Sequence, residues 1–200
     1  MKYHPPGGSD SGSRGARGNP AEMIYLDNAA TTFPKPREVL ERMIDLYEAK
    51  GVSPGRGGYD CAQEADELVS EVRKTLCRFF GGDDPNRVIF ASNATDALNL
   101  VIQGSIKPGG HIVSSQLEHN SVLRPLQPLQ EKGLIDYDLV PFAGQGFIDP
   151  DDVSRAIQSR TQLVVLTHAS NVLGTIQPIE AIGAVCREKE VPFVLDTAQS

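Results

Sequence analysis

The sequence lacks several features that would place a protein in other classes. It has no apolar run near the roughly 18 residues that a membrane span needs, so we expect a soluble protein without contact with a membrane. It also lacks a basic excess: the formal net charge is -7 at pH 7. Because nucleic-acid binding depends on a basic face, this balance argues against nucleic acid as a main partner.

Cysteines are few, and their spacing follows no pattern. The three residues are Cys61, Cys77 and Cys186, an odd number at wide intervals, which predicts neither a disulfide framework nor a zinc site. Cys77 and Cys186 fall within apolar helical patterns, where we expect small buried thiols. Reduced thiols, together with the lack of an apolar signal-peptide segment, predict a cytoplasmic location.

Motifs of other enzyme classes are absent as well. There is no GxSxG of a serine hydrolase and no dinucleotide-binding GxGxxG. The four histidines have no metal-ligand spacing, so no metal site is predicted. We expect structural roles for His111 and His168, which lie at the start of or within predicted strands.

Composition divides the chain into two parts. Residues 1–22 are rich in Gly, Ser, Pro and Arg and are predicted to be a disordered tail. Met23 directly precedes the sequence IYLD and is an alternative start. Residues 23–200 are expected to form one domain, because a chain of this length with 40% hydrophobic residues can bury one core.

Apolar strand patterns alternate with amphipathic helix patterns from residue 36 onward. Helices are predicted over 36–49, 62–80, 94–104, 122–132 and 179–189, with a further one opened by Asp149-Pro150. Five strands are predicted: RVIFAS (87–92), HIVSS (111–115), DYDLVPF (136–142), LVVLTHA (163–169) and FVLD (193–196). Strands buried on both faces and separated by helices indicate an α/β fold with a mostly parallel sheet.

Ligands of such sheets bind beyond the carboxyl ends of the strands. After RVIF, the sequence ASNAT leads into a helix, whose N-terminal N–H groups at Ala94 and Thr95 suit a phosphate. A plain helix cap by Ser92 or Asn93 is the alternative. After HIVSS comes His119, which is either a ring that stacks on a planar ligand or a structural hydrogen-bonding residue.

The last two predicted strands also end in polar residues. Asn171 follows LVVLTHA and could hold a ligand oxygen or make an Asx-turn. Asp196 ends FVLD, and Gln199 lies nearby. A carboxylate at the end of a buried strand needs a cation or donors, although it could also cap a following helix. A phosphate cradle, a stacking ring, an amide and a carboxylate together match pyridoxal 5'-phosphate, in which an aspartate keeps the ring nitrogen protonated.

Six motifs in order resemble those of the cysteine desulfurases and selenocysteine lyases. They are YLDNAATT (25–32), SPGRGGYDCAQEA (53–65), FASNATDALNLV (90–101), EHNS (118–121), THASNVLGTIQPI (167–179) and VLDTAQS (194–200). The chain thus resembles the N-terminal half of a class V aminotransferase-fold (fold type I) enzyme, with residues 23–200 as a partial cofactor-binding large domain.

The resemblance implies roles for individual residues. Ala94 and Thr95 would bind the phosphate, and His119 would stack on the pyridine ring. Asn171 and Gln199 would contact the phenolic oxygen, and Asp196 would pair with the ring nitrogen. Ala29, Ala30 and Arg56 would lie on the substrate side. The implied activity is that of a cysteine desulfurase, a homodimer that passes sulfur to an acceptor protein, as in iron–sulfur cluster assembly.

The family's Schiff-base lysine and sulfur-accepting cysteine have no match in this chain. None of its seven lysines follows a histidine after a strand, and none of its cysteines matches the family's loop. We therefore expect no catalytic residue here and no activity of this chain alone. Selenocysteine lyase, epimerase and aminotransferase activities remain alternatives, as does a non-catalytic binding or assembly module.

The resemblance also carries an expectation about folding. In the family's topology, RVIFAS would lose its usual neighbour in this chain, and FVLD would become an exposed edge, which is an aggregation hazard. We therefore expect the 200-residue chain to be marginally stable by itself.

Overall fold

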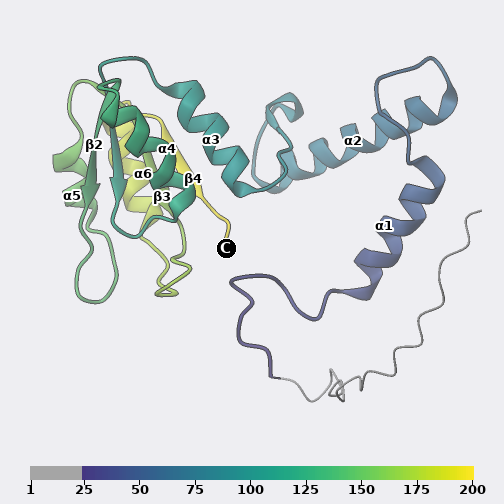
Figure 1. The fold of residues 1–200 in the computed structure, drawn as a ribbon, viewed down its shortest axis with the longest axis horizontal. Coiled ribbons are helices and arrows are strands. Elements are labelled where there is room, and N and C mark those ends of the chain that lie inside the picture. The colour runs from purple at the N-terminus through teal and green to yellow at the C-terminus, as the bar shows by residue number, and fades with distance from the viewer. Residues whose placement is uncertain (1–23) are drawn as a thin grey trace, which may run out of the picture. The chain divides into compact units, whose positions relative to one another are not determined.

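The structure is a computed structural model that describes residues 24–200. The tail predicted to be disordered, residues 1–22, lies outside the described residues, as does Met23. The chain divides into two compact units, one up to Ala65 and the other from Asp66 to Ser200 (Figure 1). In residues 24–200, no helix is both long and apolar enough to cross a membrane.

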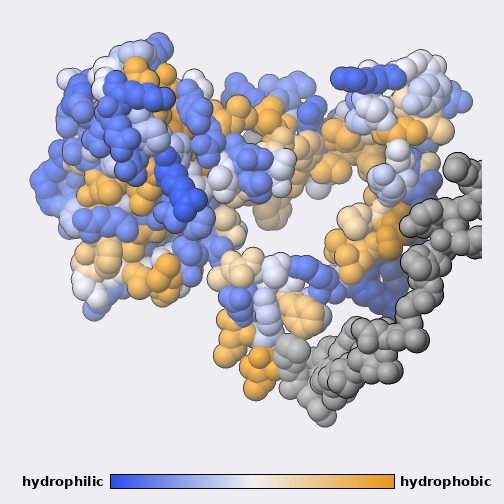
Figure 2. All heavy atoms as spheres, in the orientation of Figure 1, coloured by the Kyte–Doolittle hydropathy of each residue, from blue (hydrophilic) through white to orange (hydrophobic). Residues whose placement is uncertain are grey.

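The first unit contains helix α1, Arg37–Lys50, and the start of helix α2, Asp60–Phe79. No residue of α1 is buried, and its apolar side chains, among them Met43 and Ile44, are exposed. Figure 2 shows hydrophobic surface along both helices. Lys50 forms an ion pair with Glu64 at 3.1 Å, which joins the end of α1 to the first turns of α2.

The second unit contains the sheet. After the remainder of α2 its elements are η2 Pro85–Arg87, α3 Ala94–Ser105, β1 Gly110–Ser115, α4 Asn120–Glu131, β2 Ile135–Val140, α5 Pro150–Ala156, β3 Thr161–Thr167, α6 Ile179–Glu188 and β4 Phe193–Asp196. The strands pair in the order β2-β1-β3-β4, and every pair is parallel. This confirms the predicted α/β fold with a parallel sheet.

Successive side chains along the strands pack alternately into two hydrophobic cores, one on each face of the sheet. Val113, Val164 and Leu166 pack in the core that includes Ile182 and Cys186 of α6. Side chains of the opposite parity from β1 and β3 pack in the second core with residues of α3 and α4: Leu98, Ile102, Ile112, Val122, Leu126, Leu163 and Val165. The strands are apolar on both faces because helices cover both, as parallel sheets require. The predicted burial of Cys77 and Cys186 is confirmed.

The predicted strand RVIFAS is wrong for this chain. Residues 88–91 have no regular secondary structure, and the side chains of Ile89 and Phe90 are 64% and 49% exposed. The apolar pattern is present, but a strand also needs a neighbour for its backbone hydrogen bonds, and no strand of the described sheet pairs with this segment. The other four predicted strands form, and β4 lies at one edge of the sheet, as expected.

Candidate functional site

Most of the predicted cofactor residues gather at the carboxyl edge of the sheet. All four strands are parallel, so the segments that follow them emerge at the same edge. Thr95 and His119 line one hollow, His119 and Asn171 line a second, and Ala94 and Asp196 line a third. The structure thus brings five of the six predicted residues into three hollows of one unit.

The N-terminus of α3 is available to an anion. Asn93 caps the helix, and its Oδ1 accepts a hydrogen bond from the Asp96 N–H at 2.8 Å. Ala94 and Thr95 occupy the first two helical positions, where backbone N–H groups have no carbonyl partner within the helix. The cap predicted as an alternative to phosphate binding is therefore present, and it leaves the N–H groups of Ala94 and Thr95 for a phosphate.

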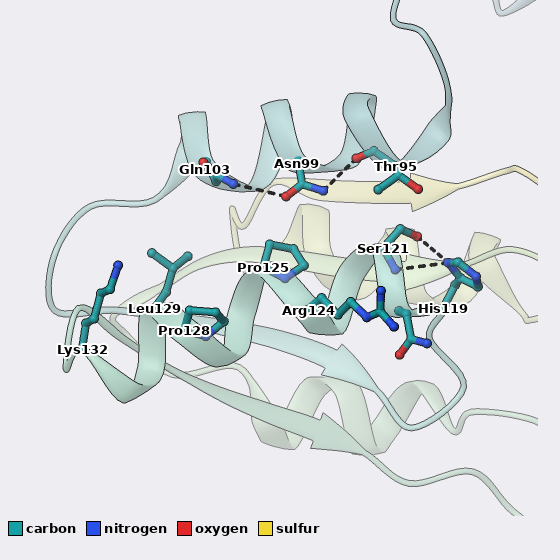
Figure 3. A pocket seen from close by; sticks show the side chains of 11 residues that line it. Thr95, Asn99, Gln103, His119, Ser121, Arg124, Pro125, Pro128, Leu129 and Lys132 are labelled. Carbon is teal, nitrogen blue, oxygen red and sulfur yellow. Dashed lines mark hydrogen bonds between the residues drawn. The ribbon is translucent and has the colours of Figure 1, made fainter.

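His119 is held by the helix that it opens. It caps α4, and its Nδ1 accepts the Ser121 N–H at 3.1 Å, with Ser121 Oγ 2.8 Å from the same nitrogen. Because Nδ1 acts as an acceptor, the ring proton lies on Nε2. Figure 3 shows the ring beside Ser121 at one end of the groove between α3 and α4. This geometry supports the predicted structural hydrogen bonding, and stacking of the ring on a planar ligand stays a prediction.

The same groove contains two cationic side chains that no sequence pattern predicted, Arg124 and Lys132. Arg124 of α4 lines the hollow together with Thr95 and His119, and Lys132 lies farther along (Figure 3). On the α3 side, Asn99 donates to the Thr95 carbonyl at 2.9 Å. Arg124 is five residues after His119, and its side chain points toward the His119 end of the groove (Figure 3). A positive charge here favours an anion near the α3 N-terminus.

The turn after β3 is built by Ser170 and not by Asn171. Ser170 is buried, and its Oγ accepts the N–H groups of Val172 and Leu173 at 3.3 and 3.1 Å. The predicted alternative, an Asx-turn made by Asn171, is therefore wrong. Asn171 is exposed and lines the hollow that also contains His119.

Asp196 is a buried carboxylate that accepts a hydrogen bond from a backbone N–H. The residue is 6% exposed, and Oδ1 accepts the Ala198 N–H at 3.0 Å. A buried carboxylate is stabilised by further donors or a cation, so this group fits the protonated ring nitrogen of pyridoxal phosphate. Gln199 lies in the exposed turn that follows and does not line the three hollows, so its contact with the cofactor stays a prediction.

The predicted substrate-side residues belong to the first unit. Ala29 and Ala30 lie in a turn in which the Ala30 N–H donates to the Asp27 carbonyl at 3.1 Å. Arg56 lies in an exposed bend before α2. Their assignment to the substrate side stays a prediction.

Glu118 is a second buried carboxyl group at this edge, and no role for it was predicted from the sequence. Its side chain is 8% exposed, and Oε1 accepts hydrogen bonds from Ser115 Oγ at 2.6 Å and from the Thr167 N–H at 3.0 Å. Oε2 is buried without a hydrogen bond. Burial raises the pKa of Glu118 to about 7, the two hydrogen bonds oppose this, and the nearby Asp196 carboxylate adds to it.

The amino edge of the sheet contains a separate polar cluster. His111 is buried, with Nδ1 2.9 Å from Thr161 Oγ1 and Nε2 3.2 Å from the Asp138 carboxylate. These contacts support the predicted structural role of His111. Within residues 24–200, no group of three or more His, Cys, Asp or Glu side chains could hold a metal ion.

Comparison with known proteins assigns the family. The sequence pattern of the family "Aminotransferase class-V" matches residues 24–200. The chain belongs to the class-V aminotransferase family. Members of this family use pyridoxal phosphate, the cofactor inferred from the strand ends.

Class-V relatives resemble the chain over most of its length. A mitochondrial cysteine desulfurase of Candida maltosa is 35% identical to this chain. The match covers 98% of this chain and 42% of that protein. The apo structure of a cysteine desulfurase from Thermococcus onnurineus NA1 has a TM-score of 0.81 at 32% identity, with 90% of this chain and 45% of that chain covered.

The chain also resembles a second solved structure, SspA in complex with cysteine. Its TM-score is 0.80 at 32% identity, and 89% of this chain covers 51% of that chain. The chain thus spans about half the length of these relatives, and its fold is that of the fold type I pyridoxal-phosphate enzymes.

Proposed function

We propose that this chain supplies the N-terminal portion of a pyridoxal-phosphate-dependent cysteine desulfurase. The reaction converts L-cysteine to L-alanine and leaves the sulfur as a persulfide on the enzyme. The observation that carries the proposal is Asp196, a buried carboxylate at the carboxyl end of β4 that accepts one backbone hydrogen bond. It lines a hollow with Ala94, at the helix terminus suited to the phosphate.

The chain's own residues hold and tune the cofactor. The N–H groups of Ala94 and Thr95 bind the phosphate, and the His119 ring covers one face of the pyridine. Asn171 and Gln199 bind the phenolic oxygen. Asp196 keeps the proton on the ring nitrogen, and the bound cofactor then supplies an electron sink. Ala29, Ala30 and Arg56 would contact the substrate.

Catalysis needs groups that we do not assign to any residue of this chain. Among the lysines of residues 24–200, two are engaged in ion pairs, Lys50 with Glu64 and Lys74 with Glu71. None of the seven matches the family's lysine position. We therefore propose that the chain by itself binds pyridoxal phosphate reversibly and releases no sulfide from cysteine.

The partners and location of the whole protein follow the same proposal. The structure of SspA with cysteine supports an amino-acid substrate for this chain's family. We propose a homodimer that transfers sulfur to an acceptor protein in the cytoplasm. Sulfide release from cysteine, compared with amino transfer to a keto acid, separates a desulfurase from the other class-V activities in the whole enzyme.

The first test is a titration of the 200-residue chain with pyridoxal phosphate, followed by absorbance. We expect saturable binding, and we expect Asp196→Asn to weaken it by about 10- to 100-fold, since a charge-assisted hydrogen bond contributes roughly 1.5–3 kcal/mol. Asp83→Asn, an exposed aspartate before η2, is the matched control and should bind as the wild type does.

Borohydride reduction and peptide mass spectrometry complete this test. We expect no single lysine to carry the cofactor after reduction. A wild-type chain that does not bind pyridoxal phosphate would contradict the proposal, and equal affinities of Asp196→Asn and the wild type would contradict the role of Asp196. Stoichiometric labelling of one lysine would show that the chain holds a reactive lysine after all.

A further inference from the structure

Glu118 connects β1 and β3 near their carboxyl ends, beyond the residues that pair through the backbone. The register pairs of β1 and β3 run from His111 to Val113. Beyond them, Ser114 Oγ donates to the Val165 carbonyl at 3.0 Å, and the Thr167 N–H donates to Glu118 Oε1 at 3.0 Å. The carboxyl group of Glu118 thus takes the place of a strand carbonyl at the carboxyl edge of the sheet.

The same oxygen ties Glu118 to its own strand. Ser115, the last residue of β1, donates its hydroxyl to Oε1 at 2.6 Å, and the Leu117 N–H donates to Ser115 Oγ at 3.2 Å. Oε1 therefore holds the end of β1 and the end of β3 at once. Because these bonds are buried, they are stronger and less exchangeable than the same contacts in water.

The two strand ends carry the residues proposed to contact the cofactor ring. His119 is the next residue after Glu118, and Asn171 comes four residues after Thr167. Both line the hollow that Glu118 also lines. A shift between β1 and β3 at this edge would change the separation of His119 and Asn171, and binding geometry tolerates only small displacements.

We propose that Glu118 is a positioning residue of the cofactor site, whose carboxyl group locks the carboxyl ends of β1 and β3 and so sets the separation of His119 and Asn171. This inference deepens the proposed function and rests on it. Glu118 acts through the positions of His119 and Asn171 and not by contact with the reacting atoms.

Two substitutions separate positioning from charge. Glu118→Gln keeps an oxygen that can accept hydrogen bonds from Ser115 and Thr167, so the connection between the ends of β1 and β3, here called the lock, should be retained. Glu118→Ala removes it. We expect Glu118→Ala to weaken pyridoxal phosphate binding about 10-fold or more, and Glu118→Gln to stay within about 3-fold of the wild type, in line with the effect of outer-shell partners at other sites.

Each variant has a matched control. Val153→Ala removes part of a fully buried side chain on α5 and controls for loss of stability without loss of the lock. Glu188→Gln, at the exposed end of α6, controls for the loss of one negative charge. Both should bind pyridoxal phosphate as the wild type does.

A second readout needs no cofactor. In two-dimensional NMR spectra of the chain alone, Glu118→Ala should shift the ring signals of His119 and the side-chain amide signals of Asn171, while Glu118→Gln and Val153→Ala leave them in place. If the wild type binds no pyridoxal phosphate, the proposed function fails, and these spectra still decide the role of Glu118. Unshifted signals in Glu118→Ala, or unchanged affinity in a chain that binds the cofactor, would overturn the inference.

Discussion

Glu118 and Asp196 are buried carboxyl groups that flank the end of β3. Asp196 pairs with Thr167 in the register of β3 and β4, and the Thr167 N–H donates to Glu118. Burial makes ionisation of Glu118 unfavourable, and the negative charge of Asp196 adds to this. The protonation state of Glu118 therefore changes close to neutral pH, so the stability of the fold depends on pH there.

The stability of the fold should fall as pH rises, because the pKa of Glu118 is higher in the folded chain than in the unfolded chain. The pKa of Glu118 is raised from 4.5 to about 7 in the folded chain, so between these values the folded state keeps a proton that the unfolded state has lost. The contribution of Glu118 to stability is thus full below pH 4.5 and is lost as pH rises through 7, by about 3 kcal/mol.

Glu118→Gln should remove this pH dependence. Urea unfolding of both proteins between pH 4.5 and 8 measures it. The free energy of unfolding of the wild type should fall relative to that of the variant as pH rises, because all other titrating groups are common to both. Parallel curves would show that Glu118 ionises as an exposed carboxyl does.

At the scale of single elements, α3 depends on its cap. Asn93 has extended backbone geometry, and its side chain binds the Asp96 N–H. Asn93→Ala should lower the free energy of unfolding by about 1 kcal/mol. Asn93→Asp should lower it much less, because an aspartate also caps a helix. Urea unfolding at constant pH tests this, and a loss of similar size in both variants would contradict a capping role.

The helices and four strands could be predicted because each carries its own apolar period. FVLD, for example, forms a strand over the predicted residues 193–196. RVIFAS could not be judged in the same way, because a strand exists only with a hydrogen-bonding neighbour, which the segment itself does not encode. The local pattern decides which face is apolar, and the rest of the sheet decides whether the strand forms.

The site was predictable to the same extent. His119, Asn171 and Asp196 were predicted because each follows or ends a strand of the parallel sheet, whereas Ala94 and Thr95 were predicted from RVIFAS, an apolar pattern that forms no strand here. The lock made by Glu118 was missed, since its partner Thr167 lies 49 residues away and no spacing rule connects them. The signal available was a carboxylate three residues after a buried strand, beside a candidate ligand residue.

At the scale of the whole molecule, the two units differ in how much of their surface is buried. No residue of α1 is buried, whereas every residue of β1 is. Helices of this length are marginal in water without packing, so α1 should open far more often than the sheet.

Brief trypsin treatment should therefore cut the first unit before the second. Early sites are expected at Arg37, Arg42, Lys50 and Arg56, and a fragment that contains the four strands should persist longer. Mass spectrometry of a digestion time course identifies the order. Cleavage at Arg155 or Arg160, next to the sheet, at the same rate as in α1 would contradict it.

The strand order β2-β1-β3-β4 also bears on synthesis at the ribosome. Once β2 has emerged it can pair with β1, β3 then adds to the free side of β1, and β4 adds to β3. Each strand after the first thus finds its neighbour already made, so a nascent chain can extend the sheet in step with translation, without waiting for a later segment to fill a gap between strands.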